Sequence, residues 1–89
     1  MITISELQVK DIVAVDTGKK LGHLTDLDID IHQGVIRAIV ITTKGKVMGM
    51  FGQVEEWVIP WKNIINIGED VILVRHVQTP VIKEYPKVE

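Results

Sequence analysis

Apolar and acidic residues alternate from Leu24 to Ile31, and this alternation constrains the fold more than any other feature of the sequence. A period of two is typical of a half-buried strand, with the apolar side chains packed inward and the carboxylates in water. Gly34 then permits the positive φ of a tight turn, and a second run rich in β-branched residues extends from Val35 to Thr42. We therefore predict a long antiparallel hairpin over which the other segments close. The inward set is Leu27, Ile29 and Ile31, and the outward set is Asp26, Asp28 and Asp30.

The composition predicts one all-β domain with an aliphatic core. The chain has 89 residues, which is near the lower limit of what a single hydrophobic core stabilises without help. Apolar residues make up 46% of the sequence but aromatic residues only 4%, and the abundant Ile and Val favour strands over helices. Because the sequence has no cysteine, disulfides and thiolate metal sites are excluded.

Charge and hydropathy patterning predict a soluble, cytoplasmic protein. Ten Lys and Arg against twelve Asp and Glu leave a net charge of −2, and the basic residues are scattered. Nucleic-acid binding is disfavoured, because a phosphate backbone attracts clustered positive charge. The first residues lack the basic stretch and apolar run of a signal peptide, and no apolar run approaches the roughly 20 residues that cross a bilayer. We expect no membrane insertion.

The remaining segments predict short strands joined by local turns. They indicate a small antiparallel β-barrel, closed or partly open, of about six strands with one or two short helical turns. In chain order, the predicted features are a capping box at Ser5–Gln8, a strand at Asp11–Asp16, a bulge or close backbone approach at Gly22, a strand from Trp57 stopped by Pro60, a helical turn at Trp61–Ile64 and a second hairpin at Ile65–Arg75.

The last fourteen residues differ from the rest in character. Pro80 and Pro86 exclude a regular central strand, and the ending is charged. We predict a barrel domain over residues 1–75 and a C-terminal extension over residues 76–89. The extension would form either an extra edge strand through Val81 and Ile82 or an inter-subunit arm.

Candidate interaction residues lie between Lys44 and Trp57. The flexible methionines and the single phenylalanine of a glycine-rich segment would make an adaptable contact surface. The alternative, that these side chains only cover the mouth of the barrel, is equally compatible with the sequence. Nearby lysines would steer an acidic partner. Trp57 is expected to be partly exposed, although one or both tryptophans (Trp57 and Trp61) would fit the end of the barrel. The candidates are Met48, Met50, Phe51, Trp57, Lys44 and Lys46.

The three carboxylates of the first hairpin are weak candidates for a divalent cation site. Oxygen ligands suit Ca²⁺ and Mg²⁺, but alternate residues of a strand stand about 6.6 Å apart, too far for Asp26, Asp28 and Asp30 to close on one ion. A solvated acidic face is the favoured interpretation. A zinc site drawing on His32 and Asp30 has no supporting ligand spacing. We expect no metal and no cofactor.

No catalytic group is predicted from the sequence. Ser5 is the only serine and lies at an expected helix cap, so a Ser-His-Asp arrangement has no nucleophile. Two carboxylates on one strand face do not make an acid and base pair without a pocket. The sequence therefore favours a protein that is not an enzyme.

Three stretches of the chain carry a resemblance to a known family. They are Ser5-Glu6-Leu7 with Lys10 to Val13, Leu21-Gly22 through Asp26–Asp30 to Gly34, and Ile59-Pro60-Trp61 with Ile67 to Val74, preceded by Met50-Phe51-Gly52 and Glu55-Glu56. In this order they resemble the PRC-barrel domain, a small β-barrel also found in the photosynthetic reaction centre H subunit and in a ribosome maturation factor. The third stretch is similar to the small stand-alone YlmC/YmxH-type sporulation proteins of spore-forming bacteria. The resemblance covers about residues 1 to 75.

The resemblance implies a non-catalytic adaptor that binds another protein. We also expect self-association, with a homodimer favoured, through an exposed strand edge or the Met48–Phe51 loop, because the edges of so small a barrel are imperfectly closed and can pair. Relatives are thought to hold protein or ribonucleoprotein assemblies together, and the role of the sporulation subgroup is not established. An RNA- or ribosome-associated module is the alternative, against which stand the negative charge and the lack of aromatic stacking residues. A cation or small-ligand binder on the Asp26–Asp30 strand is the second alternative.

Overall fold

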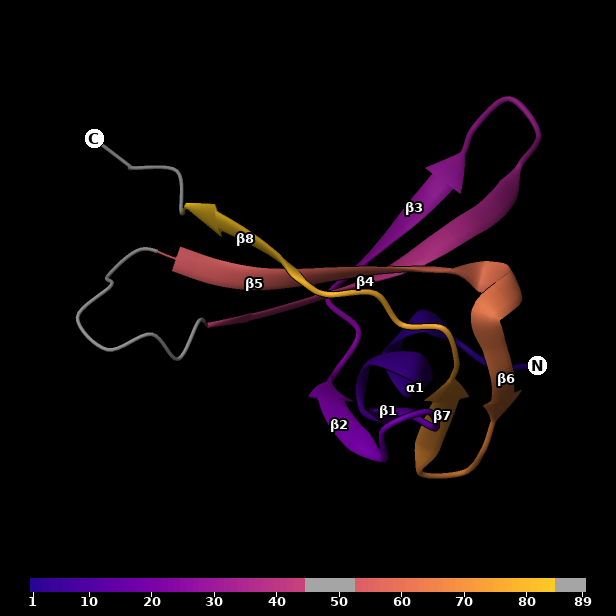
Figure 1. The fold of residues 1–89 in the computed structure, drawn as a ribbon. Helices are drawn as coiled ribbons and strands as arrows, with labels where there is room; N and C mark the ends of the chain where they lie inside the picture. The colour runs from indigo at the N-terminus through magenta and orange to yellow at the C-terminus, as the bar shows by residue number, and fades with distance from the viewer. Residues whose placement is uncertain (45–52, 85–89) are drawn as a thin grey trace.

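A computed structural model describes residues 1–44 and 53–84 (Figure 1). In these residues the chain forms two four-stranded sheets, in the orders β2-β1-β7-β6 and β3-β4-β5-β8, with one α-helix and one 3₁₀ turn. The sheets do not close into a continuous barrel, so the predicted fold class, a small and partly open β-barrel, is confirmed. The elements are α1 (Ile4–Gln8), β1 (Asp11–Ala14), β2 (Lys19–Gly22), β3 (Asp26–Asp30), β4 (Val35–Lys44), β5 (Gln53–Pro60), η1 (Trp61–Asn63), β6 (Ile64–Ile67), β7 (Val71–Val74) and β8 (Val81–Glu84).

Both predicted hairpins are present. β3 pairs with β4 in antiparallel register, and the Gly34 amide, at φ 68°, donates to the Asp30 carbonyl across 2.7 Å to close the turn. β6 pairs with β7 in the same way, and η1 precedes it directly after Pro60, as predicted. These elements are local in sequence, which is why turn residues and strand periodicity were sufficient to predict them.

One strand pair differs from the antiparallel arrangement predicted for the whole barrel. β1 and β7 run parallel, with Asp11 opposite Val71 and Ala14 opposite Val74. A parallel pair needs a long crossover, and here the chain between the two strands forms most of the second sheet before it returns. The pairing therefore depends on tertiary structure that local turns do not encode.

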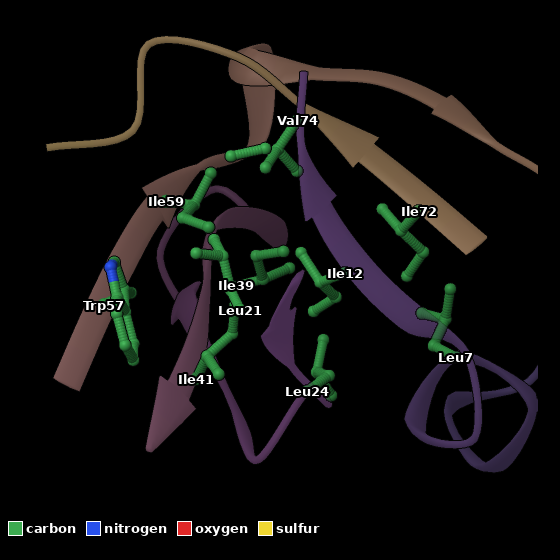
Figure 2. Close-up of a cluster of buried hydrophobic side chains, with 11 residues drawn as sticks. Leu7, Ile12, Leu21, Leu24, Ile39, Ile41, Trp57, Ile59, Ile72 and Val74 are labelled. Carbon is green, nitrogen blue, oxygen red and sulfur yellow. The ribbon is translucent and has the colours of Figure 1, made fainter. Parts of the chain in front are cut away.

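The core lies between the two sheets and is aliphatic apart from one indole (Figure 2). Six side chains in it are essentially inaccessible to water, and five of these are isoleucines. The shape-defined packing of β-branched side chains on the inner faces of strands accounts for the abundance of Ile in the sequence. The buried cluster comprises Leu7, Ile12, Ala14, Leu21, Leu24, Ile39, Ile41, Trp57, Ile59, Ile72 and Val74.

Gly22 lies where β2 of the first sheet passes against β4 of the second. Its φ is 133°, and a Cβ at this position would meet Thr43 Cγ2 at 3.3 Å and Ile41 Cγ2 at 3.4 Å. The β1–β2 ladder shifts register beside it, between Ile12 and Val13. The bulge and close approach predicted at Gly22 are therefore confirmed, and they bring the two sheets together.

The helix cap differs from the predicted one. Thr3 is the N-cap: its Oγ1 accepts a hydrogen bond from the Glu6 amide at 3.2 Å, and the Glu6 carboxylate accepts one from the Thr3 amide at 3.4 Å. The predicted box at Ser5–Gln8 is wrong, although both pairs satisfy the same sequence pattern. Starting the helix at Ile4 places Leu7 in the core with 5% of its surface exposed.

The inward burial predicted for part of the first hairpin is also wrong. Ile29 is 50% exposed and Ile31 is 82% exposed, whereas Leu27 of the same set packs against the core. Figure 1 shows why: the tip of the β3–β4 hairpin projects beyond the first sheet, which covers only the base of the hairpin. Alternation indicates which side chains share a face, but it does not show whether anything covers that face.

The chain leaves the first sheet through a fixed turn and returns to the edge of the second. The Asp16 carboxylate accepts a hydrogen bond of 2.6 Å from the His76 amide, and His76 has φ 54°. After this turn, Val81–Glu84 pairs with Gln53–Glu56 as the edge strand β8. The division into a domain over residues 1–75 and an extension over 76–89 stays a prediction.

Within the described residues, no helix has both the length and the apolar character needed to cross a membrane.

Candidate protein-interaction surface

The second sheet carries apolar residues on the side that faces away from the core. On β4 and β5, Ile39, Ile41 and Ile59 point into the core, so the alternate residues point outward. Val40 stands directly opposite Val58 in the ladder, and Ala38 stands opposite Pro60. Val81 on β8 follows on the same face. We call this set, Ala38, Val40, Val58, Pro60 and Val81, the outer apolar face.

Water reaches part of this face. Val58 is 53% exposed and Val81 is 54% exposed, whereas Val40 is half-buried and Ala38 is only 5% exposed. The half-buried Thr42 and Glu56 lie between Val81 and the other members. The outer face of an antiparallel sheet normally carries polar residues, so an exposed Val58 beside a half-buried Val40 indicates a binding surface.

An acidic margin borders the outer apolar face on the β3 side. Asp26 is paired with Val40 and Asp28 with Ala38, and both aspartates are exposed. The Asp26 carboxylate also accepts a hydrogen bond of 2.8 Å from the Leu27 amide. Asp30 serves the turn instead, because its Oδ1 accepts hydrogen bonds from the amides of His32 and Gln33. No three His, Asp or Glu side chains in the described part of the chain are grouped closely enough to hold a metal ion.

The opposite margin is the free edge of β8. This four-residue strand is the last of its sheet, paired on one side only with β5 among the described strands. Ile82 stands opposite Glu55 on the other face and is 58% exposed. An edge strand with exposed apolar side chains and free backbone groups can pair with a strand of another protein.

A pocket lies between the core and the segment that leads to β8. Its volume is about 220 Å³, and its lining includes Trp57, Leu21, Lys19 and Val77. The Lys19 Nζ stands 6.0 Å from the centre of the Trp57 ring, at the outer limit of a cation–π contact. Trp57 is only 6% exposed, so the partial exposure predicted for it is wrong; Trp61, at 37%, is the more accessible indole. The interaction role of Trp57 stays a prediction.

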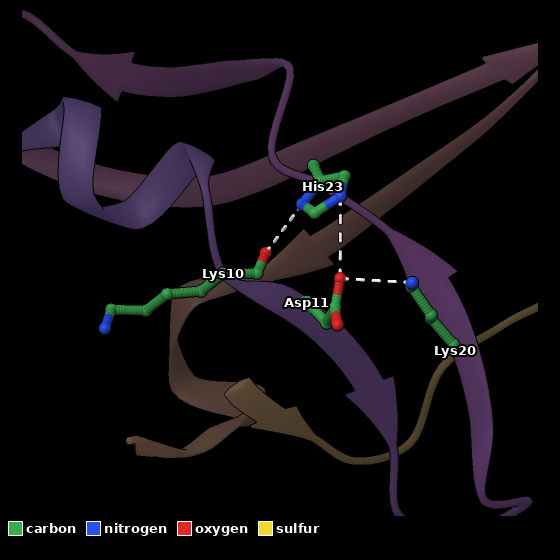
Figure 3. Close-up of polar contacts among 4 residues, drawn as sticks. All are labelled: Lys10, Asp11, Lys20 and His23. Carbon is green, nitrogen blue, oxygen red and sulfur yellow. Dashed lines mark hydrogen bonds and ion pairs between the residues drawn. The ribbon is translucent and has the colours of Figure 1, made fainter. Parts of the chain in front are cut away.

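A polar cluster ties β2 to β1 at the edge of the first sheet (Figure 3). Asp11 Oδ1 lies 3.2 Å from Lys20 Nζ and 3.5 Å from His23 Nε2, and His23 Nδ1 lies 3.0 Å from the Lys10 carbonyl oxygen. Lys10 itself is buried, and its Nζ donates to the Glu69 carbonyl. His23 and Asp11 lie far apart in the sequence, and the β1–β2 pairing brings them together. The Lys20 and Asp11 side chains are well exposed, so their ion pair contributes about 1 kcal/mol or less.

Most of the interaction residues predicted from the sequence are not placed by the structure. Lys46, Met48, Met50 and Phe51 lie outside the described residues. Lys44 ends β4 opposite Val54. Their role in binding stays a prediction. The outer apolar face was missed, although the nearly continuous apolar run from Val35 to Ile41 was its signal in the sequence: only one residue in it is charged.

Comparison with known proteins agrees with this architecture. The family model of the PRC-barrel domain matches residues 1–78. The chain is 61% identical over 75 residues to the probable sporulation protein YlmC of Bacillus subtilis, covering 84% of this chain and 93% of that protein. It is 39% identical over 72 residues to the uncharacterized protein YmxH of the same organism, covering 79% and 84%. An uncharacterized protein of Clostridium acetobutylicum is 35% identical over 72 residues, covering 81% and 82%. The predicted resemblance is confirmed, and the chain belongs to the PRC-barrel domain family.

Proposed function

We propose that this protein is a non-catalytic adaptor that binds other proteins in the cytoplasm during sporulation. The observation that carries the proposal is the exposed apolar surface of the second sheet, formed by the outer apolar face and the free edge of β8. The link to sporulation is supported by the 61% identity to a protein named as a probable sporulation protein.

The placement of the polar side chains also supports a non-catalytic role. Asp11, Lys20 and His23 lie at an exposed strand edge, where water reaches all three side chains. In the pocket beside Trp57, the Asp16 carboxylate is engaged by the His76 amide. Neither arrangement supplies a nucleophile with an adjacent base, which acyl or phosphoryl transfer requires.

The mode of binding that we propose for the β8 edge is strand addition. An extended segment of a partner pairs with the free backbone groups of Val81–Glu84 and contacts Ile82 on one face of the sheet. Main-chain hydrogen bonds supply affinity in this mode, and alternate side chains supply specificity.

The test is affinity capture of the tagged protein from sporulating cells of a spore-forming host, with and without nuclease. Ile82→Lys is the edge variant, because a lysine opposite Glu55 is tolerated by the monomer but obstructs an apolar partner. Val15→Lys is the matched control, since Val15 is 43% exposed and lies away from the second sheet. We expect nuclease-resistant protein partners that Ile82→Lys loses and Val15→Lys keeps. Loss of all partners on nuclease treatment would favour the RNA-associated alternative.

A further inference from the structure

We propose that the pocket beside Trp57 binds a free α-amino acid with an apolar side chain. The pocket has a volume of about 220 Å³ and lies between the turn that joins β1 to β2 and the segment that joins β7 to β8. Figure 1 shows this segment crossing from the first sheet to the second. The inference goes beyond the adaptor function, because the described lining of the pocket contains neither the outer apolar face nor Ile82.

The floor of the pocket is apolar and belongs to the core. Ala14, Leu21 and Trp57 line it, each no more than 6% exposed, and the half-buried Val77 adds to the same surface. A buried water needs about two to four polar partners, which an apolar floor does not offer, whereas an apolar cavity of about 150 Å³ accepts benzene. The pocket is therefore large enough for a leucine, methionine or phenylalanine side chain.

The mouth of the pocket carries one cation and one anion. Lys19 and Asp16 belong to the lining and are exposed. The Lys19 Nζ lies over the Trp57 ring, 6.0 Å from its centre, and no ion pair of the described residues involves it. Oδ2 of Asp16 accepts the hydrogen bond from the His76 amide, which leaves Oδ1 to accept another. An ammonium and a carboxylate that are not paired with each other match the two charged groups of an amino acid.

The turn that holds these charges supplies a further donor and is fixed in place. Thr17 Oγ1 accepts a hydrogen bond of 3.2 Å from the Lys19 amide, so the hydroxyl proton of Thr17 is available to a ligand carboxylate. The bond of 2.6 Å between Asp16 and the His76 amide ties the turn to the segment that forms the other wall. Because both walls are held before a ligand arrives, binding requires little ordering of the protein.

A ligand with a single charge fits this mouth less well. Phenylacetate would bring its carboxylate close to that of Asp16, and phenethylamine would bring its ammonium close to that of Lys19, and like charges brought together are unfavourable. At the lower end of ligand efficiency, a ligand of about twelve non-hydrogen atoms has a Kd of about 2 mM. We therefore expect a Kd of about 2 mM or below for L-phenylalanine.

The experiment is a titration of the isotope-labelled full chain with L-phenylalanine to about 20 mM, followed by heteronuclear NMR, so that the range exceeds the expected Kd about tenfold. The two indole N–H signals give an internal comparison, because Trp57 lines the pocket and Trp61 does not. We expect a saturable shift of the Trp57 signal and little change at Trp61. Phenylacetate and phenethylamine, titrated in the same way, are expected to bind about threefold more weakly or worse.

Two variants test the charged groups separately. Lys19→Gln is expected to weaken the binding of L-phenylalanine about threefold or more, and to leave that of phenethylamine no weaker. Lys20→Gln is the matched control, because the Lys20 Nζ lies 3.2 Å from Asp11 Oδ1 and Lys20 does not line the pocket. Asp16→Asn, which keeps an oxygen for the His76 amide, is expected to weaken L-phenylalanine but not phenylacetate.

A Trp57 signal that does not move at about 20 mM L-phenylalanine would overturn the proposal. So would equal affinities for the three ligands, which would indicate an apolar pocket that does not select by charge, or equal effects of Lys19→Gln and Lys20→Gln. Failure here is distinguishable from failure of the adaptor function, because the capture experiment depends on Ile82→Lys and not on this pocket.

Discussion

Replacing Gly22 by alanine tests how the two sheets are held together. At φ 133° an L-residue is strained, which costs about 1–3 kcal/mol. The new Cβ would also stand 3.3 Å from Thr43 Cγ2 and 3.4 Å from Ile41 Cγ2, and relieving that crowding in a packed interior costs about 1–3 kcal/mol more. Gly22→Ala is therefore expected to lower the free energy of unfolding by about 2–6 kcal/mol, summed from these two effects.

The assay is urea denaturation, monitored by tryptophan fluorescence and by circular dichroism. For a domain of this size each kcal/mol shifts Tm by about 4–8 °C, so a fall of roughly 8–48 °C is expected in a parallel thermal scan. Gly18→Ala is the matched control, because Gly18 has φ 69° but no atom within 4 Å of its would-be Cβ. Its cost is the backbone strain alone, about 1–2 kcal/mol. Equal losses in the two variants would refute the close approach of β2 and β4.

Three further predictions concern stability, each measured as the free energy of unfolding in urea. Ile41→Ala removes a fully buried side chain and should lower the free energy of unfolding by about 2–5 kcal/mol. Ile31→Ala, at the exposed hairpin tip, should stay within about 0.5 kcal/mol of wild type. Similar losses in the two variants would contradict the burial of Ile41 and the exposure of Ile31. Thr3→Ala should lower the free energy of unfolding by about 0.5–2 kcal/mol, because it removes the N-cap of α1. An unchanged stability would show that Thr3 does not cap the helix. Asp16→Ala should cost about 1.5–3 kcal/mol because the His76 amide loses its charged acceptor, with a smaller loss for Asp16→Asn; equal stability would show that the turn does not depend on this bond.

The parts of the fold that sequence reasoning predicted are those encoded locally. The turn at Gly34 and the alternation of β3 define one hairpin, and Pro60 followed by a short helical turn marks the corner before the other. Gly22 was identified because glycine within a strand marks a bulge or a close approach. In each case the responsible residues lie within a few positions of the feature that they determine.

The features that were missed depend on what lies across a strand. Ile29 and Ile31 have the periodicity of a core face but project past the first sheet. Nothing in the sequence around Trp57 indicated that its indole would be buried in the core. The parallel pairing of β1 and β7 joins segments separated by three of the four strands of the second sheet.

The candidate site was predicted less well than the fold for a related reason. The sequence drew attention to an unusual segment, Met48 to Phe51, because methionine and glycine stand out in composition. The outer apolar face is built from ordinary strand residues such as Val40 and Val58, which a sequence alone assigns to a core. Only the strand register separates them from Ile39 and Ile59 and places them on the solvent side.

The most direct test of the adaptor function is site-specific photo-crosslinking in sporulating cells. A photoreactive amino acid would be placed in turn at Val58, at Ile82 and at Glu69, an exposed residue of the β6–β7 turn that serves as the control. We predict light-dependent adducts to protein from positions 58 and 82 that resist nuclease, and few from position 69. Adducts no more abundant at 58 and 82 than at 69, or adducts that nuclease removes, would contradict a protein-binding role for the second sheet.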